Sequence, residues 1–182
     1  MGTNHMGRQS IRFPQPPVVR GFASVAGKKE REGPLGDQFT ATVQDTTFGE
    51  KSWERAERRM QQMTLELALE KAGLTDADLD AAFAGDLLNQ CIGSSFSLRN
   101  RGVPTLGLYG ACSTMAESLL LAAMSVSGGF ARTALAMTSS HFASSERQYR
   151  FPLGYGGQRT PTSQWTVTGA GAVLLGSGEH GI

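Results

Sequence analysis

The stretch TLGLYGACSTMAESLLLAAMSV, residues 105–126, decides the fold prediction because it reads as a strand, a turn and a helix in direct succession. Residues 105–109 form a short apolar run that is typical of a buried strand. Two small residues then allow a tight turn, and Cys112 stands where the helix begins. The helix carries a single charge, Glu117, and a helix that is apolar on nearly every side is normally buried all round.

The rest of the chain alternates between strands and helices in the same way. We expect helices over 51–72 and 92–100, and strands over 18–26, 81–85, 105–109, 133–139 and 166–175. Several of these strands are continuous apolar runs, which indicates a parallel α/β sheet with both faces covered. The polar segments 27–49 and 141–164 are predicted to be loops.

Composition favours one folded domain and excludes several kinds of protein. The chain has 182 residues, of which 40% are hydrophobic and 18% are charged. The formal net charge of +1 gives no reason to expect a nucleic-acid partner. Two cysteines suit a reducing compartment rather than a disulfide framework. No apolar run approaches the roughly 18 residues of a membrane span, so no transmembrane segment is predicted.

The two ends of the chain differ from its centre. The opening residues MGTNHM resemble a cloning remnant, and residues 1–17 are polar and proline-bearing, so we expect them to be flexible. Residues 18–182 are expected to form the folded unit. We leave His5 out of the functional reasoning because it belongs to the remnant.

Three polar side chains follow predicted strands at positions where α/β proteins bind ligands. Asp86, Cys112 and His141 each come just after a strand, and the carboxyl ends of parallel strands share one rim. A thiol at the start of a helix has a lowered pKa, which favours a site role for Cys112. A free cysteine is equally common as a small core residue, so both interpretations stay open at this point.

Six segments carry a resemblance to a known family, and they are KKEREGPLG, KSWERAERRM, FAGDLLNQ, YGACST, TSSHFASSERQYRFPLGYGGQ and VTGAGAV. Together they resemble the stage V sporulation protein AD family of the thiolase superfamily, over residues 18–175. The cysteine turn is shared by the whole superfamily, whereas AGDLLNQ and the SERQYRFP to YGGQ region are specific to the family. The resemblance implies one half of a thiolase-like fold, a mixed, mostly parallel sheet flanked by helices, with the C-terminal half absent.

The resemblance also implies a function. Members of this family belong to the machinery that moves dipicolinic acid, or its calcium chelate, into the developing spore. We therefore expect this chain to bind dipicolinate without catalysing a reaction, with other stage V sporulation membrane proteins as partners. The implied location is cytoplasmic or peripheral on the spore inner membrane.

The alternative is a thiolase-type acyltransferase with Cys112 as nucleophile. Such chemistry needs a base to activate the thiol and donors for the thioester oxygen. In the superfamily the catalytic histidines come largely from the second half. His141 follows a different strand and does not match them, and His180 is near the end of the chain, where we expect it to be mobile. We therefore expect this chain not to be an enzyme.

Dipicolinate, a flat ring with two carboxylates, needs cationic or N–H donors and an aromatic wall. Arg147 and Arg150 could each hold a carboxylate, His141 could donate from its ring, and Lys29, next to Lys28, could close over the rim beside Cys112. Aromatic walls could come from Tyr149, Phe151 and Tyr155. No cofactor is expected, unless calcium accompanies the ligand.

If calcium is bound with the ligand, Asp86 and Glu146 are the expected oxygen donors. Each candidate also has a structural interpretation. Arg147 could pair with Glu146 on the surface, His141 could be a hydrogen-bonded structural histidine, and Asp86 could cap the segment after its strand. Lys29 could be plain surface charge.

A half-fold has one further consequence. The helix after Cys112 would lose the packing that the second half normally supplies, and exposed apolar surface is unfavourable. We therefore expect this chain to form a homodimer in which a second copy covers that helix.

Overall fold

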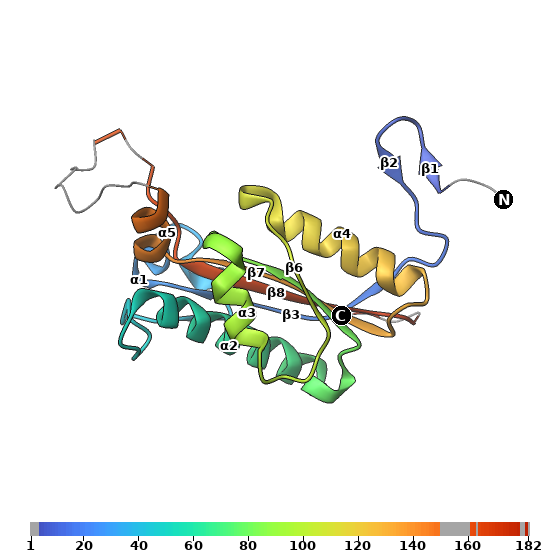
Figure 1. Cartoon of the computed structure of the whole chain (residues 1–182), viewed down its shortest axis with the longest axis horizontal. Helices are drawn as coiled ribbons and strands as arrows, with labels where there is room; N and C mark the ends of the chain where they lie inside the picture. Colours follow the sequence, from blue (N-terminus) through green and yellow to red (C-terminus); the bar gives the residue numbers. More distant parts are fainter. Residues whose placement is uncertain (1–3, 150–160, 163, 179–180, 182) are drawn as a thin grey trace.

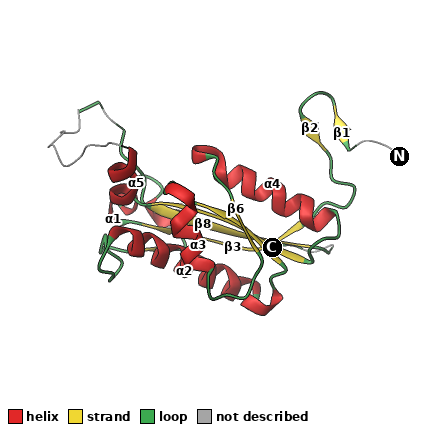
Figure 2. Ribbon diagram, in the orientation of Figure 1, coloured by secondary structure: helices red, strands yellow, loops and turns green. Residues whose placement is uncertain are grey.

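The computed structural model describes residues 4–149, 161–162, 164–178 and 181, and it contains a six-stranded sheet with helices on both faces (Figures 1 and 2). The strand order is β4-β3-β8-β7-β5-β6. The strands are β3 (Val18–Ala26), β4 (Ala41–Thr42), β5 (Ala81–Gly85), β6 (Thr105–Gly107), β7 (Thr133–Ser140) and β8 (Gly169–Gly176). A separate antiparallel pair, β1 (His5–Met6) and β2 (Ser10–Ile11), lies within the segment expected to be flexible.

The sheet is mixed, as the family resemblance implied. β4 is parallel to β3, and β7, β5 and β6 run parallel to one another. β8 is antiparallel to both of its neighbours, β3 and β7. The fully parallel sheet suggested by alternation alone is therefore wrong at β8. The chain between β7 and β8 returns to the same end of the sheet instead of crossing it, and an antiparallel neighbour follows from such a connection.

Two long helices cover opposite faces of the sheet (Figure 1). α2 (Trp53–Ala72) packs against β3, β8 and β7, with α3 (Ile92–Leu98) beside it, while α4 (Thr114–Ser127) packs on β7, β5 and β8. α2 begins after Ser52, whose hydroxyl accepts from the Arg55 N–H at 3.3 Å, and it ends at Gly73 in the left-handed conformation that glycine favours.

The shorter elements lie at the sheet's ends. They are α1 (Lys28–Arg31), α5 (Phe142–Tyr149) and the 3-10 turns η1 (Gly36–Gln38), η2 (Asp76–Asp78), η3 (Asn89–Cys91) and η4 (Ala111–Ser113). α5 corrects the prediction that 141–164 is all loop. Tertiary contacts stabilise this polar helix, because its Arg147 pairs with Glu54 of α2 and its Tyr149 hydroxyl donates to the Leu87 carbonyl at 2.8 Å.

The core consists of two apolar layers, one on each face of the sheet. The layer under α2 includes Leu65, Ala68, Leu135, Met137 and Leu174. The layer under α4 includes Phe83, Ala122, Val126, Ala134 and Leu175. Alternate residues of β7 and β8 enter opposite layers, as the two-residue period of a strand requires.

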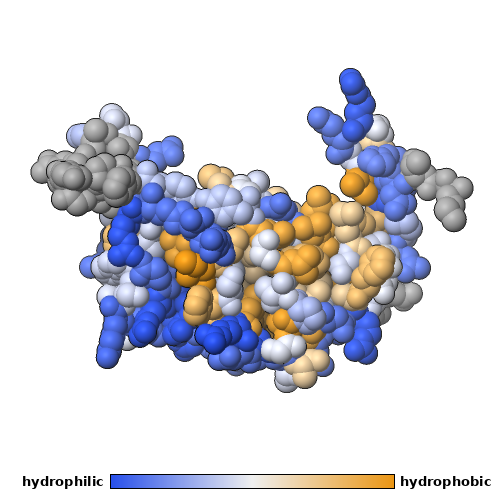
Figure 3. Space-filling model, in the orientation of Figure 1, coloured by the Kyte–Doolittle hydropathy of each residue, from blue (hydrophilic) through white to orange (hydrophobic). Residues whose placement is uncertain are grey.

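α4 is exposed along one face, as the half-fold led us to expect, although a helix of this composition is normally buried on every side. Ala116, Leu120 and Met124 recur every four residues and form an exposed stripe, with Leu120 44% and Met124 45% exposed. Among the described helices, α4 alone covers its side of the sheet, and no other described helix lies on its outer side (Figure 1). Apolar side chains also reach the surface across the face that carries α3, β6 and α4 (Figure 3).

None of the described helices has the length and apolarity that crossing a bilayer would require.

Candidate functional site

The three residues predicted to share one rim lie at the same end of the parallel strands. Because β5, β6 and β7 run in the same direction, Asp86, the Cys112 turn and His141 all lie beyond the same edge of the sheet. This part of the sequence prediction is confirmed. The three side chains nevertheless face different surroundings.

The Cys112 turn is tightly built. Ala111 has a positive φ of 49°, a conformation that costs free energy in a residue with a Cβ atom and that is held here by its surroundings. The Gly110 N–H donates to the Thr114 hydroxyl at 3.1 Å, and this hydroxyl donates to the Ala111 carbonyl at 2.9 Å. Gly85 allows the turn to approach β5, since a Cβ at that position would lie 2.1 Å from the Leu108 oxygen.

Cys112 itself is exposed and lines a cavity of about 650 Å³, which we call the Cys112 cavity. Its described lining residues are all uncharged. Most of them come from η4, from the end of β7, from the start of β8 and from the residues just before it, and they include Thr138, Ser140, Val167 and Gly169. The cavity therefore offers hydroxyl groups and apolar surface, and no cation from the described residues.

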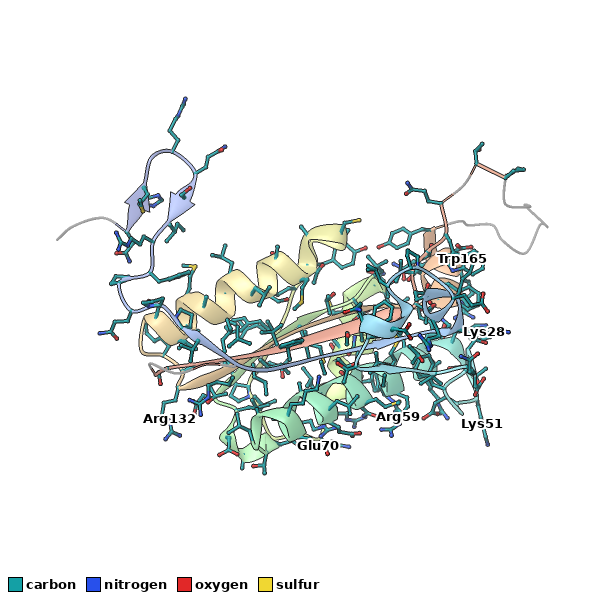
Figure 4. The ribbon with its side chains drawn as sticks, turned by 180° about the vertical axis from the view of Figure 1, so that it is seen from behind. Lys28, Lys51, Arg59, Glu70, Arg132 and Trp165 are labelled. Carbon is teal, nitrogen blue, oxygen red and sulfur yellow. The ribbon has the colours of Figure 1, made fainter. Side chains whose placement is uncertain are left out.

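A second cavity, of about 300 Å³, is lined by charged side chains of both signs, two lysines and two glutamates. Its walls include Lys28, Lys29, Thr46, Phe142 and Trp165, and we call it the Lys29 cavity. Figure 4 shows Lys28 and Trp165 at the same end of the molecule. Sequence reasoning proposed Lys29 as a rim residue, and the structure places it in this cavity with Trp165, which is 39% exposed.

The Lys29 cavity has an aromatic wall with a cation above it. The Lys29 Nζ lies 4.1 Å from the centroid of the Trp165 ring, a cation–π distance. Trp165 stacks on Phe142, with ring centroids 5.4 Å apart and planes 21° apart. Two hydrogen bonds fix these segments, because the Thr168 N–H donates to the Glu30 carboxylate at 3.1 Å and the Gly27 N–H donates to the Thr168 carbonyl at 2.8 Å.

His141 lies behind this wall rather than in a cavity. Its ring is fully buried, and its Nε2 hydrogen-bonds the Thr46 carbonyl at 2.8 Å. Its Nδ1 accepts from the Ala143 N–H at 3.3 Å, so the neutral ring with a proton on Nε2 satisfies both bonds. Burial lowers the pKa of His141, which favours the same neutral form. The ring is packed between Trp53 and Phe142.

Asp86 is also buried in a polar turn of its own. One carboxylate oxygen accepts from the Leu88 N–H at 2.9 Å, and the other accepts from the N–H and the hydroxyl of Ser94 at 2.7 and 2.6 Å. The side chain is 1% exposed and lines neither cavity. The structure therefore places Asp86 where it caps the start of α3.

Of the two arginines predicted to hold the ligand's carboxylates, only Arg147 is among the described residues. Arg147 pairs with Glu54 of α2, and Glu146 is half-buried on α5. Arg150, with the proposed walls Phe151 and Tyr155, lies outside the described residues, as does His180. Tyr149 is described, and its hydroxyl hydrogen-bonds the hydroxyl of Tyr109. In the described ranges, no group of three or more His, Cys, Asp or Glu side chains could hold a metal ion.

Sequence reasoning missed a buried polar cluster beneath β7. Glu57 and Gln61 lie on the inner face of α2, both fully buried. The hydroxyls of Ser139 and Ser144 donate to the two oxygens of Glu57 at 2.8 and 2.7 Å. Burial raises the pKa of Glu57 to about 7, although the serine hydrogen bonds oppose the shift. The signal was present in the sequence, since positions 57, 61, 64 and 68 follow a helical face.

Comparison with solved structures defines the class of fold. The 3-oxoacyl-[acyl-carrier-protein] synthase III of Aquifex aeolicus matches with a TM-score of 0.59 and 18% identity, over 90% of this chain and 55% of its own. The corresponding enzyme of Xanthomonas oryzae matches with a TM-score of 0.59 and 16% identity, over 90% and 56%. Identities this low show the fold alone. The chain has a thiolase-like fold and covers about half of each of these proteins.

Sequence comparison then gives the family. The pattern of the stage V sporulation protein AD family matches residues 7–182. The stage V sporulation protein AD of Bacillus subtilis (strain 168) is 45% identical over 169 residues, which are 93% of this chain and 50% of that relative. The chain therefore belongs to the stage V sporulation protein AD family, and it spans about half the length of the curated relative it matches.

Proposed function

We propose that this chain contributes a dipicolinate-binding site to the spore's dipicolinic acid uptake machinery, at the periphery of the spore inner membrane with the other stage V sporulation membrane proteins as partners. The observation that carries the proposal is the position of Lys29 above the Trp165–Phe142 stack. For a flat aromatic dianion to lie against the indole face that Phe142 leaves open, the Lys29 ammonium moves aside from that face and donates hydrogen bonds to the ligand's carboxylate.

The Lys29 cavity suits such a ligand better than the Cys112 cavity does. Two lysines line the former, whereas the described lining of the latter is uncharged. Removing a dianion from water is costly unless cations or N–H donors replace its hydration. Glu30 and Glu32 also line the Lys29 cavity, so a calcium ion bridging ligand and protein is compatible with the same place.

Calorimetric titration of this chain with dipicolinate tests the proposal directly. We expect saturable binding that weakens about tenfold in Lys29→Ala, since one charge-assisted contact is worth roughly 1.4 kcal/mol. Trp165→Leu should weaken binding as well, because it removes the flat wall. The titration is repeated with calcium chloride to show whether the chelate binds more tightly than the free acid.

Two control variants and one control ligand test whether the binding is specific to the Lys29 cavity. Lys51→Ala removes an exposed lysine that lines neither cavity, and it should leave the affinity unchanged. Cys112→Ala should also bind normally. A larger loss of affinity in Cys112→Ala than in Lys29→Ala would indicate that the ligand binds in the Cys112 cavity instead. Equal affinity for benzoate and dipicolinate would argue against a site built for two carboxylates.

Acyl transfer by Cys112 remains the alternative function, and the exposed thiol on its strained turn is the observation in its favour. No histidine is among the described residues that line the Cys112 cavity, and the His141 ring is hydrogen-bonded to the Thr46 carbonyl. We therefore propose binding without catalysis. Incubation with acetyl-coenzyme A, followed by intact-mass measurement, would reveal acyl transfer as an increment that Cys112→Ala abolishes.

We also propose that a second copy covers the α4 stripe when this chain is alone in solution. Leu120 and Met124 are nearly half exposed, and burying them against a partner is favourable at about 25 cal/mol per Å². We expect sedimentation at micromolar concentration to show a dimer that the double variant Leu120→Gln, Met124→Gln converts to monomer. Leu35→Gln, at a 64% exposed position in a loop, is the matched control and should leave the dimer intact.

A further inference from the structure

We propose that Glu57 is a proton switch at the foot of α5, in which the Ser144 hydroxyl donates to ionised Glu57 and turns to the His141 carbonyl when Glu57 is protonated. The two acceptors are already in place. The Ser144 Oγ lies 2.7 Å from Glu57 Oε2 and 3.1 Å from the His141 carbonyl oxygen. One hydroxyl proton can serve only one of them at a time.

The surroundings determine which oxygen takes the proton. Ser139 donates to Glu57 Oε1 and accepts from the Gln61 amide nitrogen at 2.6 Å. If Oε1 were protonated, the Ser139 hydroxyl would face two donors and lose its acceptor. Ser144 is different because the His141 carbonyl offers a second acceptor. The added proton therefore binds Oε2 and is donated to Ser144 Oγ. The Ser144 O–H then rotates and donates to the His141 backbone carbonyl.

The charges around Glu57 make a change of protonation reachable near neutral pH. From the β5–α3 connection, Asp86 adds a second buried negative charge, and its repulsion raises the pKa of Glu57 further. β7 and α3 face the cluster with hydroxyls, from Ser139 on the first and Ser94 and Ser97 on the second. Burial is the main reason that the pKa of Glu57 rises to about 7.

The remaining charged neighbours have other partners. Arg58 of α2 pairs with Glu50 at 3.6 Å, and Arg147 of α5 pairs with Glu54. His141 is held neutral by burial and by its bonds to backbone groups. No described cation therefore compensates Glu57, and proton uptake is the available way to neutralise it.

The switch acts on the first turn of α5. The His141 carbonyl already accepts the Ser145 N–H at 3.0 Å, the bond that begins the helix, and protonation of Glu57 adds a second donor there. The next residue, Phe142, stacks on Trp165 and donates its N–H to the Thr168 hydroxyl at 3.1 Å. A change in this turn therefore reaches the aromatic wall of the Lys29 cavity. This switch is a property of the chain itself and does not depend on which ligand that cavity binds.

Tryptophan fluorescence between pH 5.5 and 8.5 tests the switch. The chain has two tryptophans, and both belong to this cluster, Trp53 against His141 and Trp165 against Phe142. We expect the emission to change with a midpoint near the pKa of Glu57, about 7. Glu57→Gln should abolish that transition. Glu70→Gln, the same change at an exposed position of α2, should retain it.

Carbon-13 NMR of the labelled glutamate side chains supplies a measurement that needs no folded variant. We expect one carboxyl resonance to titrate near pH 7 in the unaltered chain, far above the ordinary value of 4.5 for glutamate. Circular dichroism shows whether Glu57→Gln is folded before its spectra are compared. A fluorescence transition that persists in folded Glu57→Gln would assign the effect to His141. That outcome would overturn the proposal, and so would an NMR titration in which every glutamate carboxyl titrates near the ordinary value.

Discussion

Asp86→Ala is expected to lower the free energy of unfolding by about 3–5 kcal/mol, a large part of the roughly 5–15 kcal/mol that stabilises a typical domain. The substitution leaves the Leu88 and Ser94 N–H groups without their acceptor in a buried turn. Each unsatisfied buried donor costs about 1–3 kcal/mol, and the loss of the side chain adds a small cavity. Urea unfolding measures the loss.

Two comparisons show that the effect comes from this hydrogen-bonded turn. Asp78→Ala removes an exposed carboxylate that bonds the backbone and hydroxyl of Thr75, and it should cost much less. Calcium chloride should leave the stability of the unaltered chain and of Asp86→Ala unchanged. If calcium stabilised the unaltered chain but not the variant, Asp86 would be a metal ligand as the sequence first suggested.

Stability should also fall between pH 5 and pH 8 because of Glu57. Its folded pKa of about 7 lies above the ordinary value of 4.5, so the folded state prefers the protonated form. Such a group stabilises fully below the unfolded pKa, and that contribution is lost as the pH rises through the folded pKa. A shift of this size corresponds to about 3 kcal/mol. Glu57→Gln should therefore be more stable than the unaltered chain at pH 8 and similar to it at pH 5.

His141 changes in the opposite direction and must be separated from Glu57. Its folded pKa is lowered, so its contribution is present above the ordinary value of 6.5 and is lost as the pH falls. The difference between the unaltered chain and Glu57→Gln cancels this term, because both contain His141. Glu70→Gln should show the same pH dependence as the unaltered chain. A constant difference between Glu57→Gln and the unaltered chain at all pH values would contradict the prediction.

Local pattern predicted the elements of this fold well. Apolar spacing located α2, and a short apolar run followed by small residues located the Cys112 turn and the start of α4. It failed for α5, a polar helix that depends on distant partners such as Glu54 and Leu87. It also failed for β8, because strand direction depends on how the connection returns to the sheet.

The sequence by itself determined the family, the thiolase-like fold and the rim on which Asp86, Cys112 and His141 all lie. Periodicity, turn chemistry and family motifs are local, so they survive without coordinates. Only the tertiary structure decided that Asp86 and His141 are buried, and that Lys29 contacts Trp165, which is far from it in the sequence. The physical reason is that desolvation and side-chain contact depend on which distant segments pack together, and no local pattern reports that.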